Sequence, residues 1–259
     1  MSIVVAAASL TGLLNAQTKE ALAAYTSEQF TTSDGYTLGY RMLAPETLED
    51  GRLYPLVLFM HGAGERGSDN ALQLVHGSGM FLNPVNRGNY PAYVIFPQCP
   101  EDAFWAYSTR PGNYSAGQMS SPDEPTPQIK AVRELIDEFL ASAPVDPDRI
   151  YVMGISMGAM ATYDMLIRYP GLFAAAVPIC GVVKPERIKE APSAKMWIIH
   201  GDADDVVPVA GSREAYRRFK EVGADVRYKE FVGCKHNSWD PAFNLPDFLS
   251  WIFEQRRNR

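Results

Sequence analysis

The segment Gly154-Ile155-Ser156-Met157-Gly158 lies between a strand-like run and a helix-like run, and it decides the fold of this chain. The run before it, Ile150 to Met153, is short and apolar, as expected of a buried parallel strand. The run after it, Ala159 to Leu166, is rich in helix-forming residues. A serine in so tight a strand-to-helix turn needs small neighbours, and the two glycines provide them. We therefore expect Ser156 to expose its hydroxyl at the carboxyl end of a sheet.

Two further strand-like runs are followed by loops that carry an acid and an imidazole. Trp197 to Ile199 precede a loop with three aspartates, Asp202, Asp204 and Asp205. Arg227 to Val232 alternate like a final strand and precede His236. Serine, acid and histidine in this order, each after a strand, form the arrangement of an α/β-hydrolase. A hydroxyl needs a base to become a nucleophile, so the order predicts Ser156 as nucleophile and His236 as base, with a modest preference for Asp204 as the acid.

A glycine-rich loop upstream predicts an oxyanion hole. Tyr54 to Met60 read as a strand, and residues 61–67, His-Gly-Ala-Gly-Glu-Arg-Gly, follow it. Glycines let backbone N–H groups approach a developing oxyanion without an intervening side chain. We assign the hole to the N–H groups of Ala63 and of Met157, the residue after the nucleophile.

The alternation of strand-like and helix-like segments predicts a mostly parallel central sheet with helices on both faces. Gln29 to Thr32 and Tyr36 to Met42 flank a Gly turn and predict an antiparallel hairpin at the start. The other expected elements are strands at Leu53 to Met60 and Ala92 to Phe96, a helix over Asp69 to Leu82 broken near Gly77-Ser78-Gly79, a helix that starts at Thr126-Pro127, and a last helix around Pro246 to Arg256.

Length and composition fit one catalytic domain, which we expect to cover residues 27–259. The chain has 259 residues, of which 46% are hydrophobic and 21% charged, so it can bury a full core. Its net charge of -6 argues against nucleic acid or an anionic membrane as a partner. Together with the expected triad, this favours a small-molecule ester as the binding partner, and the resemblance described below implies a carbohydrate ester.

The amino terminus resembles part of a secretory signal. Ile3 to Gln17 look like the apolar core of a signal peptide. We expect residues 1–26 to be the remnant of such a peptide or an N-terminal extension outside the catalytic core, and the protein to be secreted or periplasmic. The alternative is a cytoplasmic protein with an apolar N-terminal helix packed on the domain.

The segment from Cys99 to Glu124 has neither helical nor strand periodicity and follows a strand on the expected rim of the site. Long irregular segments in compact domains are usually functional or disordered, so we expect it to shape a substrate cleft. Trp105 and Trp239 are candidate substrate-binding residues that could stack on a sugar or aryl ring, with packing around the His loop as the equal alternative.

Other polar residues near these motifs have structural interpretations. His61 and His200 each precede a glycine at a strand end, and we expect them to hold loops by hydrogen bonds. Glu65 and Arg66 are expected to form an intramolecular ion pair that shapes the oxyanion loop. The three cysteines, Cys99, Cys180 and Cys234, match no zinc spacing, and we expect neither a metal nor a cofactor.

These motifs resemble the α/β-hydrolase serine esterases of carbohydrate esterase family 1 and the polyhydroxybutyrate-depolymerase-like group, which includes bacterial proteins called predicted peptidases. The resemblance rests on residues 58–67, 154–158 and 233–239, and on His200-Gly201 with Asp204 and Val207-Pro208.

The resemblance implies Ser156, Asp204 and His236 as the triad, with Ala63 and Met157 as backbone donors. It also implies release of acetyl or feruloyl-type acyl groups from carbohydrates, often by exported proteins. The alternatives are a serine peptidase acting on short peptides and a non-catalytic relative that binds ligands.

Overall fold

The computed structural model describes residues 16–106 and 123–257. Its centre is an eight-stranded sheet with the strand order β1-β2-β4-β3-β5-β6-β7-β8. The strands are β1 (Thr26–Thr31), β2 (Thr37–Leu43), β3 (Tyr54–Met60), β4 (Tyr93–Pro97), β5 (Val145–Ile155), β6 (Ala175–Ile179), β7 (Lys195–Gly201) and β8 (Val226–Phe231). β1 and β2 pair antiparallel, β2 and β4 pair antiparallel, and every later pair is parallel. This confirms the predicted α/β-hydrolase fold with its N-terminal hairpin.

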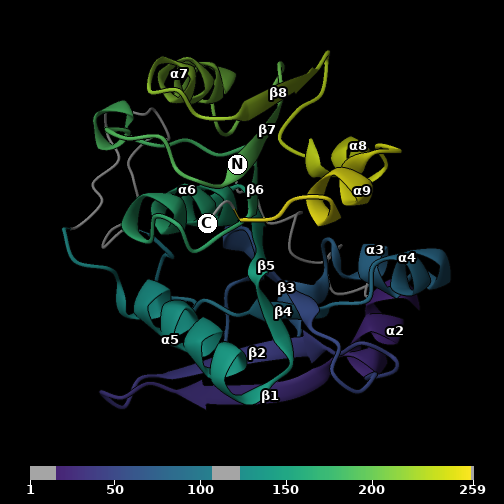
Figure 1. Ribbon diagram of the computed structural model, residues 1–259. Coiled ribbons are helices and arrows are strands. Elements are labelled where there is room, and N and C mark those ends of the chain that lie inside the picture. Colours follow the sequence, from purple (N-terminus) through teal and green to yellow (C-terminus); the bar gives the residue numbers. More distant parts are fainter. Residues whose placement is uncertain (1–15, 107–122, 258–259) are drawn as a thin grey trace, which may run out of the picture.

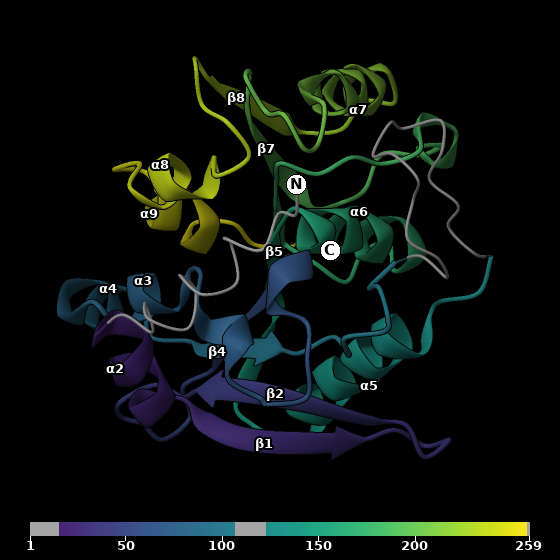
Figure 2. The ribbon, with the colours of Figure 1, turned by 180° about the vertical axis from the view of Figure 1, so that it is seen from behind.

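Helices cover both faces of the sheet, as Figures 1 and 2 show from opposite sides. The helices are α2 (Ala16–Ala24), α3 (Ser78–Leu82), α4 (Pro84–Asn89), α5 (Pro127–Ser142), α6 (Met157–Arg168), α7 (Val209–Glu221), α8 (Trp239–Phe243) and α9 (Phe248–Phe253). α5, α6 and α7 lie on one face, and α2, α3, α8 and α9 lie on the other. The sheet therefore separates two apolar cores.

β3 shows why both faces need a cover. All seven of its residues are buried, which suits a central parallel strand. Leu56, Leu58 and Met60 join the core under α5, α6 and α7, whereas Val57 and Phe59 join the opposite core. Successive side chains of a strand point to opposite faces, so an unbroken apolar run fills both cores at once.

The helix predicted at Thr126-Pro127 is confirmed as α5. The hydroxyl of Thr126 accepts the N–H of Ile129 at 3.2 Å, and Pro127 occupies the first turn. Proline loses nothing there, because the first N–H groups of a helix have no partner within it.

Two predicted helices are shorter than expected. The region Asp69 to Leu82 forms only a 3-10 turn at Leu72–Leu74 and then α3, with the break at Gly77. The Asp69 carboxylate accepts the N–H groups of Ala71 and Leu72, which holds the chain in a turn before a long helix can start. The last predicted helix is α9 alone, with the short α8 before it.

Contrary to the expectation that residues before 27 lie outside the catalytic core, Ala21 and Tyr25 contribute buried side chains to it, as in the alternative of an N-terminal helix packed on the domain. Ala21 on α2 is fully buried, and so is Tyr25, which packs its ring edge-on against Phe96 of β4. The hydroxyl of Tyr25 donates to the carbonyl of Ser78 at 3.0 Å. Burial of the Tyr25 ring removes a large apolar area from water, and the resulting gain in free energy favours packing of this segment on the sheet. Residues 1–15 lie outside the described residues.

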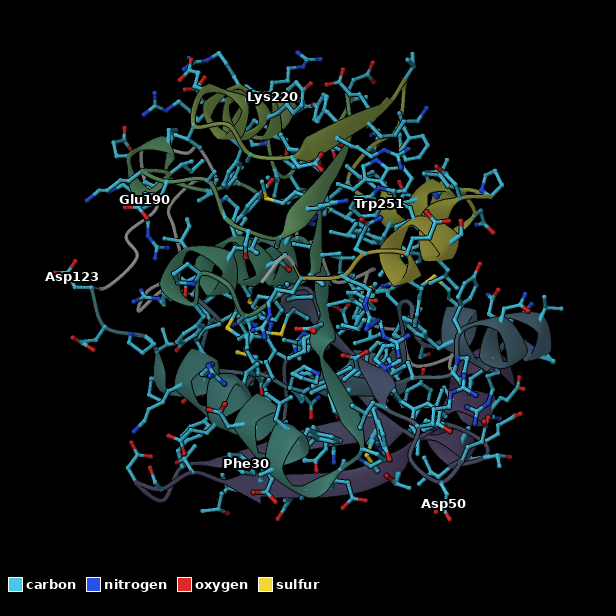
Figure 3. All side chains as sticks on the ribbon, viewed as in Figure 1. Phe30, Asp50, Asp123, Glu190, Lys220 and Trp251 are labelled. Carbon is cyan, nitrogen blue, oxygen red and sulfur yellow. The ribbon has the colours of Figure 1, made fainter. Side chains whose placement is uncertain are left out.

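None of the helices in the two described ranges is long and apolar enough to cross a membrane. The charged side chains of Asp50, Asp123 and Lys220 lie at the periphery in Figure 3.

The site residues come from the loops at the carboxyl ends of β3, β5, β7 and β8, and those ends share one edge of the sheet because the strands are parallel.

Candidate active site

Ser156 occupies the sharp turn between β5 and α6, with φ of 52° and ψ of -115°. A non-glycine residue at positive φ stores about 1–3 kcal/mol of strain, which surrounding contacts must hold in place. The flanking glycines make the turn possible. A Cβ on Gly158 would lie 1.9 Å from the carbonyl oxygen of Met60 at the end of β3, and one on Gly154 would lie 2.3 Å from the carbonyl oxygen of Gly158. The two glycines of the motif are therefore required by close backbone contacts between β5, α6 and β3.

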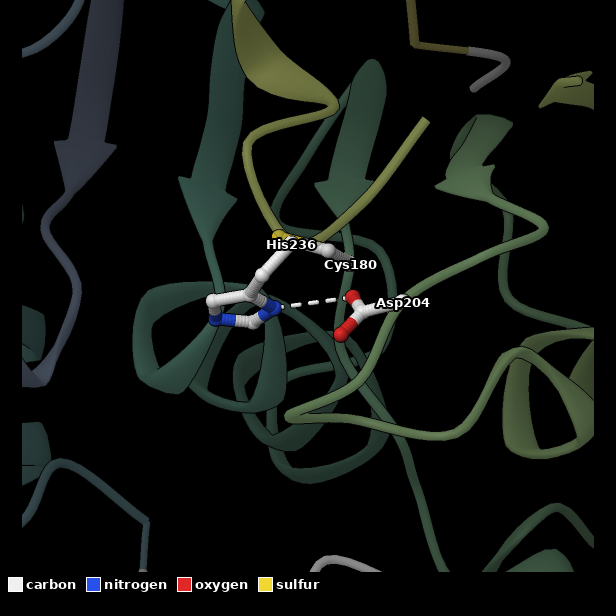
Figure 4. Close-up of side chains that lie close together, drawn as sticks. All are labelled: Cys180, Asp204 and His236. Atoms are coloured by element: carbon white, nitrogen blue, oxygen red, sulfur yellow. Dashed lines mark hydrogen bonds and ion pairs between the residues drawn. The ribbon is translucent and has the colours of Figure 1, made fainter. Parts of the chain in front are cut away.

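The imidazole of His236 lies between the other two predicted triad residues. Its Nε2 is 2.9 Å from Ser156 Oγ, and its Nδ1 is 2.8 Å from Asp204 Oδ2. Figure 4 shows the second contact, with the ring of His236 turned toward the Asp204 carboxylate. With Nδ1–H donating to the carboxylate, Nε2 is free to accept the hydroxyl proton of Ser156. This arrangement can activate a serine as a nucleophile.

The loops that carry acid and imidazole touch directly. A Cβ on Gly201, the last residue of β7, would lie 2.2 Å from the carbonyl oxygen of Cys234. Only glycine fits at such a contact. This close approach brings Asp204, after β7, beside His236, after β8.

Of the three loop aspartates, only Asp204 reaches His236. Its fully buried carboxylate also accepts the N–H groups of Val206 and Val207 at 2.9 and 2.8 Å. Asp202 instead accepts the N–H of Gly233 at 2.6 Å, and Asp205 pairs with Lys235 at 3.0 Å on the surface.

Hydrogen bonds keep the Asp204 carboxylate charged although it is buried. Burial alone would raise its pKa, but hydrogen bonds from His200, His236 and the N–H groups of Val207 and Val206 hold the pKa of Asp204 well below its usual range. A permanent negative charge at this position stabilises the imidazolium that forms when His236 takes a proton.

The two predicted oxyanion donors lie beside the serine. Ala63 opens a 3-10 turn, Ala63–Glu65, directly after β3, and Met157 is the first residue of α6. The position of a Cβ on Gly62 is 3.6 Å from Ser156 Cβ, so the turn runs alongside the nucleophile. Within the described ranges, neither N–H donates to another protein group. First-turn N–H groups are unpaired by geometry, and they are suited to bind an anion.

His61 shows what holds this turn. It is fully buried, its Nε2 accepts the N–H of Cys99 at 2.9 Å, and its Nδ1 lies 2.6 Å from the carbonyl oxygen of Gly62. Burial lowers the pKa of His61 to about 4, so the ring is neutral. The partners identify Nδ1 as the protonated nitrogen, and the ring fixes the turn as a hydrogen-bonded support.

The two candidate tryptophans occupy different environments. Trp105 is fully buried and donates its Nε1–H to the carbonyl of His61 at 3.2 Å. A ring with no exposed surface cannot stack on a substrate from solvent, so the packing alternative holds for Trp105. Trp239 is partly exposed, and it lies edge-on to His236 at a ring distance of 5.6 Å. It stays a prediction as a substrate-binding residue. The rest of the proposed cleft wall, residues 107–122, lies outside the described residues.

Glu65 and Arg66 differ from the expected ion pair. Oε1 of Glu65 is 3.7 Å from Nε2 of His76, and burial raises the pKa of Glu65. Arg66 donates to the carbonyls of Ala63 and Ala103 at 2.9 and 3.2 Å. The contact between His76 and Glu65 could not be predicted from the sequence, because no motif marks His76 and the two residues are eleven positions apart.

In the described part of the chain, one group of potential metal ligands is compact. Its members are Cys180, Asp204 and His236, whose ligand atoms all lie within 4.8 Å of one another (Figure 4). Asp204 and His236 already bond each other and further partners, and burial raises the pKa of the Cys180 thiol far above its usual range. We therefore interpret this group as the acid and base of the triad with a protonated thiol beside them.

The amino-acid sequence matches a known protein family. Residues 49–250 match the model of a family described as phospholipase/carboxylesterase. The chain belongs to this family. A thermostable esterase of known structure is 34% identical, with a TM-score of 0.81 over 92% of this chain and 64% of that one.

Two curated proteins extend the comparison of the phospholipase/carboxylesterase family. A monoacylglycerol lipase of Mycolicibacterium smegmatis is 30% identical over 162 residues, covering 57% of each chain. Carboxylesterase SOBER1 of Arabidopsis thaliana is 23% identical over 220 residues, covering 76% of this chain and 88% of that one. The chain spans about half the length, or less, of several curated relatives, the lipase among them.

Proposed function

We propose that this protein is a serine carboxylic ester hydrolase that works through an acyl-enzyme on Ser156. The observation that carries the proposal is the pair of contacts made by His236, at 2.9 Å to Ser156 Oγ and 2.8 Å to Asp204 Oδ2. Membership of the phospholipase/carboxylesterase family supports it.

In the first half of the reaction, Ser156 Oγ attacks the ester carbonyl carbon and its proton passes to His236 Nε2. The N–H groups of Ala63 and Met157 hydrogen-bond the oxyanion of the tetrahedral intermediate. The carbonyl re-forms, the bond to the alcohol oxygen breaks, and His236 returns the proton to that oxygen. Asp204 stays ionised and holds the tautomer of His236 throughout.

In the second half, water loses a proton to His236 and attacks the acyl carbon. The bond to Ser156 Oγ then breaks, the serine recovers its proton, and the carboxylic acid leaves. An alkoxide leaves more readily than an amide nitrogen, which must be protonated first. A triad with an oxyanion hole can serve both reactions, and membership of the phospholipase/carboxylesterase family is what favours an esterase over a peptidase.

For the substrate, we propose acetyl or feruloyl-type esters of carbohydrates. The motif resemblance to carbohydrate esterases and polyhydroxybutyrate-depolymerase-like proteins supports this class. The side chains beside the nucleophile fit it chemically, because Glu65 and His76 offer hydrogen-bonding groups and Trp239 offers an aromatic ring. Monoacylglycerol, named for one relative, is likewise an ester of a hydroxyl-rich alcohol.

The test compares p-nitrophenyl esters of increasing acyl length with aminoacyl-p-nitroanilides, and then acetylated with feruloylated xylo-oligosaccharides. We expect ester turnover, with release of acetate or ferulate from the sugars. A fluorophosphonate should label the wild type and the control Ser142→Ala, but not Ser156→Ala. Strong anilide turnover with negligible ester turnover would favour the peptidase alternative, and an unlabelled wild type would favour a binding protein.

A further inference from the structure

One oxygen of the proposed catalytic acid contacts two imidazoles. Asp204 Oδ2 is 2.8 Å from His236 Nδ1 and 3.1 Å from His200 Nε2. His200 is the second-to-last residue of β7. His200 and the Asp204 side chain are both fully buried. The sequence predicted only that His200 holds a loop, but its hydrogen bond to the proposed acid connects it through Asp204 to the proposed base.

The partners of His200 identify which nitrogen carries the hydrogen. Nε2 faces two acceptors, Asp204 Oδ2 and the carbonyl of Val207, at 3.1 and 3.0 Å. Neither a carboxylate nor a carbonyl can donate, so Nε2 must be protonated. Nδ1 lies 2.7 Å from Ser212 Oγ, which in turn lies 2.9 Å from the carbonyl of Gly181. Whether Nδ1 accepts or donates there, Nε2–H still points at the acid.

The surroundings of His200 limit what else could act on it. The titratable and charged groups around His200 and its partners are Asp204 and His236 from the loops, Glu230 and its partner Arg213 from β8 and α7, Tyr163 from α6, and Cys180 after β6. Glu230 pairs with His200 in the register of β7 and β8, but its carboxylate is bound by Arg213 and by the hydroxyl of Tyr228. Asp204 is therefore the carboxylate that His200 hydrogen-bonds.

We propose that His200 is a positioning residue of this site, whose Nε2–H aims Asp204 Oδ2 at His236 and weakens the negative charge that Asp204 presents to it. The inference rests on the proposed function. A donor on the shared oxygen competes with His236 for the same lone pairs, so it reduces how strongly the carboxylate stabilises an imidazolium. His200 should therefore extend the activity of the site toward acidic pH.

Removal of the donor predicts a specific change in pH dependence. In His200→Leu, Asp204 would attract protonated His236 more strongly. The acidic limb of the kcat/KM profile for p-nitrophenyl acetate should move up by about half to one pH unit. The kcat at the optimum should also fall roughly tenfold, because the carboxylate loses one of the bonds that orient it. His200→Gln keeps an N–H donor, so its acidic limb should move less, and its kcat should fall less, than in His200→Leu.

His61→Leu is the matched control, because His61 is also a buried histidine that precedes a glycine at a strand end. The partners of its ring are the carbonyl of Gly62 and the N–H of Cys99, and among the described residues no carboxylate hydrogen-bonds it. Its loss should lower the rate through the oxyanion turn without moving the acidic limb. An unmoved limb in His200→Leu as well would reduce His200 to a space-filling residue and overturn the inference.

A second measurement decides the case if His200→Leu does not fold. In the wild type labelled with ¹⁵N-histidine, NMR should show a hydrogen on His200 Nε2. An unprotonated Nε2 would overturn the inference. A wild type that hydrolyses no ester would overturn the proposed function instead, and that outcome differs from an active variant whose limb stays in place.

Discussion

The centre of the site and its edge are built by different interactions. At the centre, β3 and β5 bring together Ser156, the proposed nucleophile, and the turn Ala63–Glu65, which carries a proposed oxyanion donor, through backbone contacts that leave no room for a Cβ on Gly158. At the edge, the loops after β7 and β8 also meet through a backbone contact at Gly201, but side-chain hydrogen bonds decide which acid reaches the base. Backbone contacts are fixed by the fold, whereas side-chain bonds depend on particular donors and acceptors. Substitutions should therefore affect the two halves in different ways.

The largest effect should come from the bond that joins the two halves. Ser156→Ala and His236→Ala should each lower kcat by roughly 10⁴- to 10⁶-fold, and the double variant should be little worse than either alone. The reason is that neither group has a role without the other. Steady-state rates on p-nitrophenyl acetate measure this. If the two losses multiplied, the halves would act independently.

Within the edge half, Asp204→Asn should lower kcat by about 10³- to 10⁴-fold, because an amide cannot hold the tautomer of His236 or stabilise its charge. Asp202→Asn and Asp205→Asn provide matched controls from the same loop and should keep activity within about twofold, since their partners are Gly233 and Lys235. Full activity in Asp204→Asn would remove it as the acid.

In the central half, Gly158→Ala should destabilise the whole protein rather than only the reaction. Its Cβ would lie 1.9 Å from the Met60 carbonyl oxygen, so α6 or β3 must shift, and we expect a loss of more than about 3 kcal/mol in unfolding free energy.

Gly88→Ala on α4 is the matched control, because a Cβ there meets nothing within 4 Å. It should stabilise the protein by about 0.5–1 kcal/mol through helix propensity. Urea denaturation measures both variants, and equal stability of the two would contradict the backbone-contact explanation.

The smallest effect should come from the outer surface of the edge half. Arg213 forms a two-bond ion pair with Glu230, and this hydrogen-bonded arginine lowers the pKa of Glu230 to about 2 from an ordinary 4.5. A depressed pKa means that the pair stabilises the fold above the ordinary value and loses that contribution as pH falls toward 2.

The side chain of Arg213 is 55% exposed and that of Glu230 is 25% exposed, so solvent screens the pair, and Glu230→Gln should cost no more than about 1 kcal/mol at neutral pH and close to nothing near pH 2. Denaturation at both pH values, with exposed Glu138→Gln as reference, measures the difference. A cost that grows on acidification would have the wrong sign for this explanation.

The same contrast explains what the sequence could predict. The turn around Ser156 was predictable because its glycines report a steric demand that is visible in the local pattern. The residues alone gave only a modest preference for Asp204 among the three aspartates, since the choice depends on the N–H groups of Val206 and Val207 and on two histidines brought together by the fold.

Long-range packing also explains two of the differences between expectation and structure. Trp105 looked available for substrate, but its indole is bonded to His61, 44 positions away. Tyr25 lay in an apparent leader segment, but its ring finds Phe96 on the sheet. In both cases an aromatic side chain is buried against a partner that no local period reveals.

The turn Ala63–Glu65, which carries a proposed oxyanion donor, is held by the segment that follows β4, residues 98–105. Arg66 bonds the carbonyl of Ala103 and lies over the ring of Phe104 at 4.6 Å, and Trp105 bonds the carbonyl of His61. An insertion or deletion in this segment would therefore pull on the turn that positions Ala63. Relatives or engineered variants whose segments differ in length should therefore differ in turnover rate as well as in substrate preference. Exchange of this segment between family members should change kcat together with selectivity.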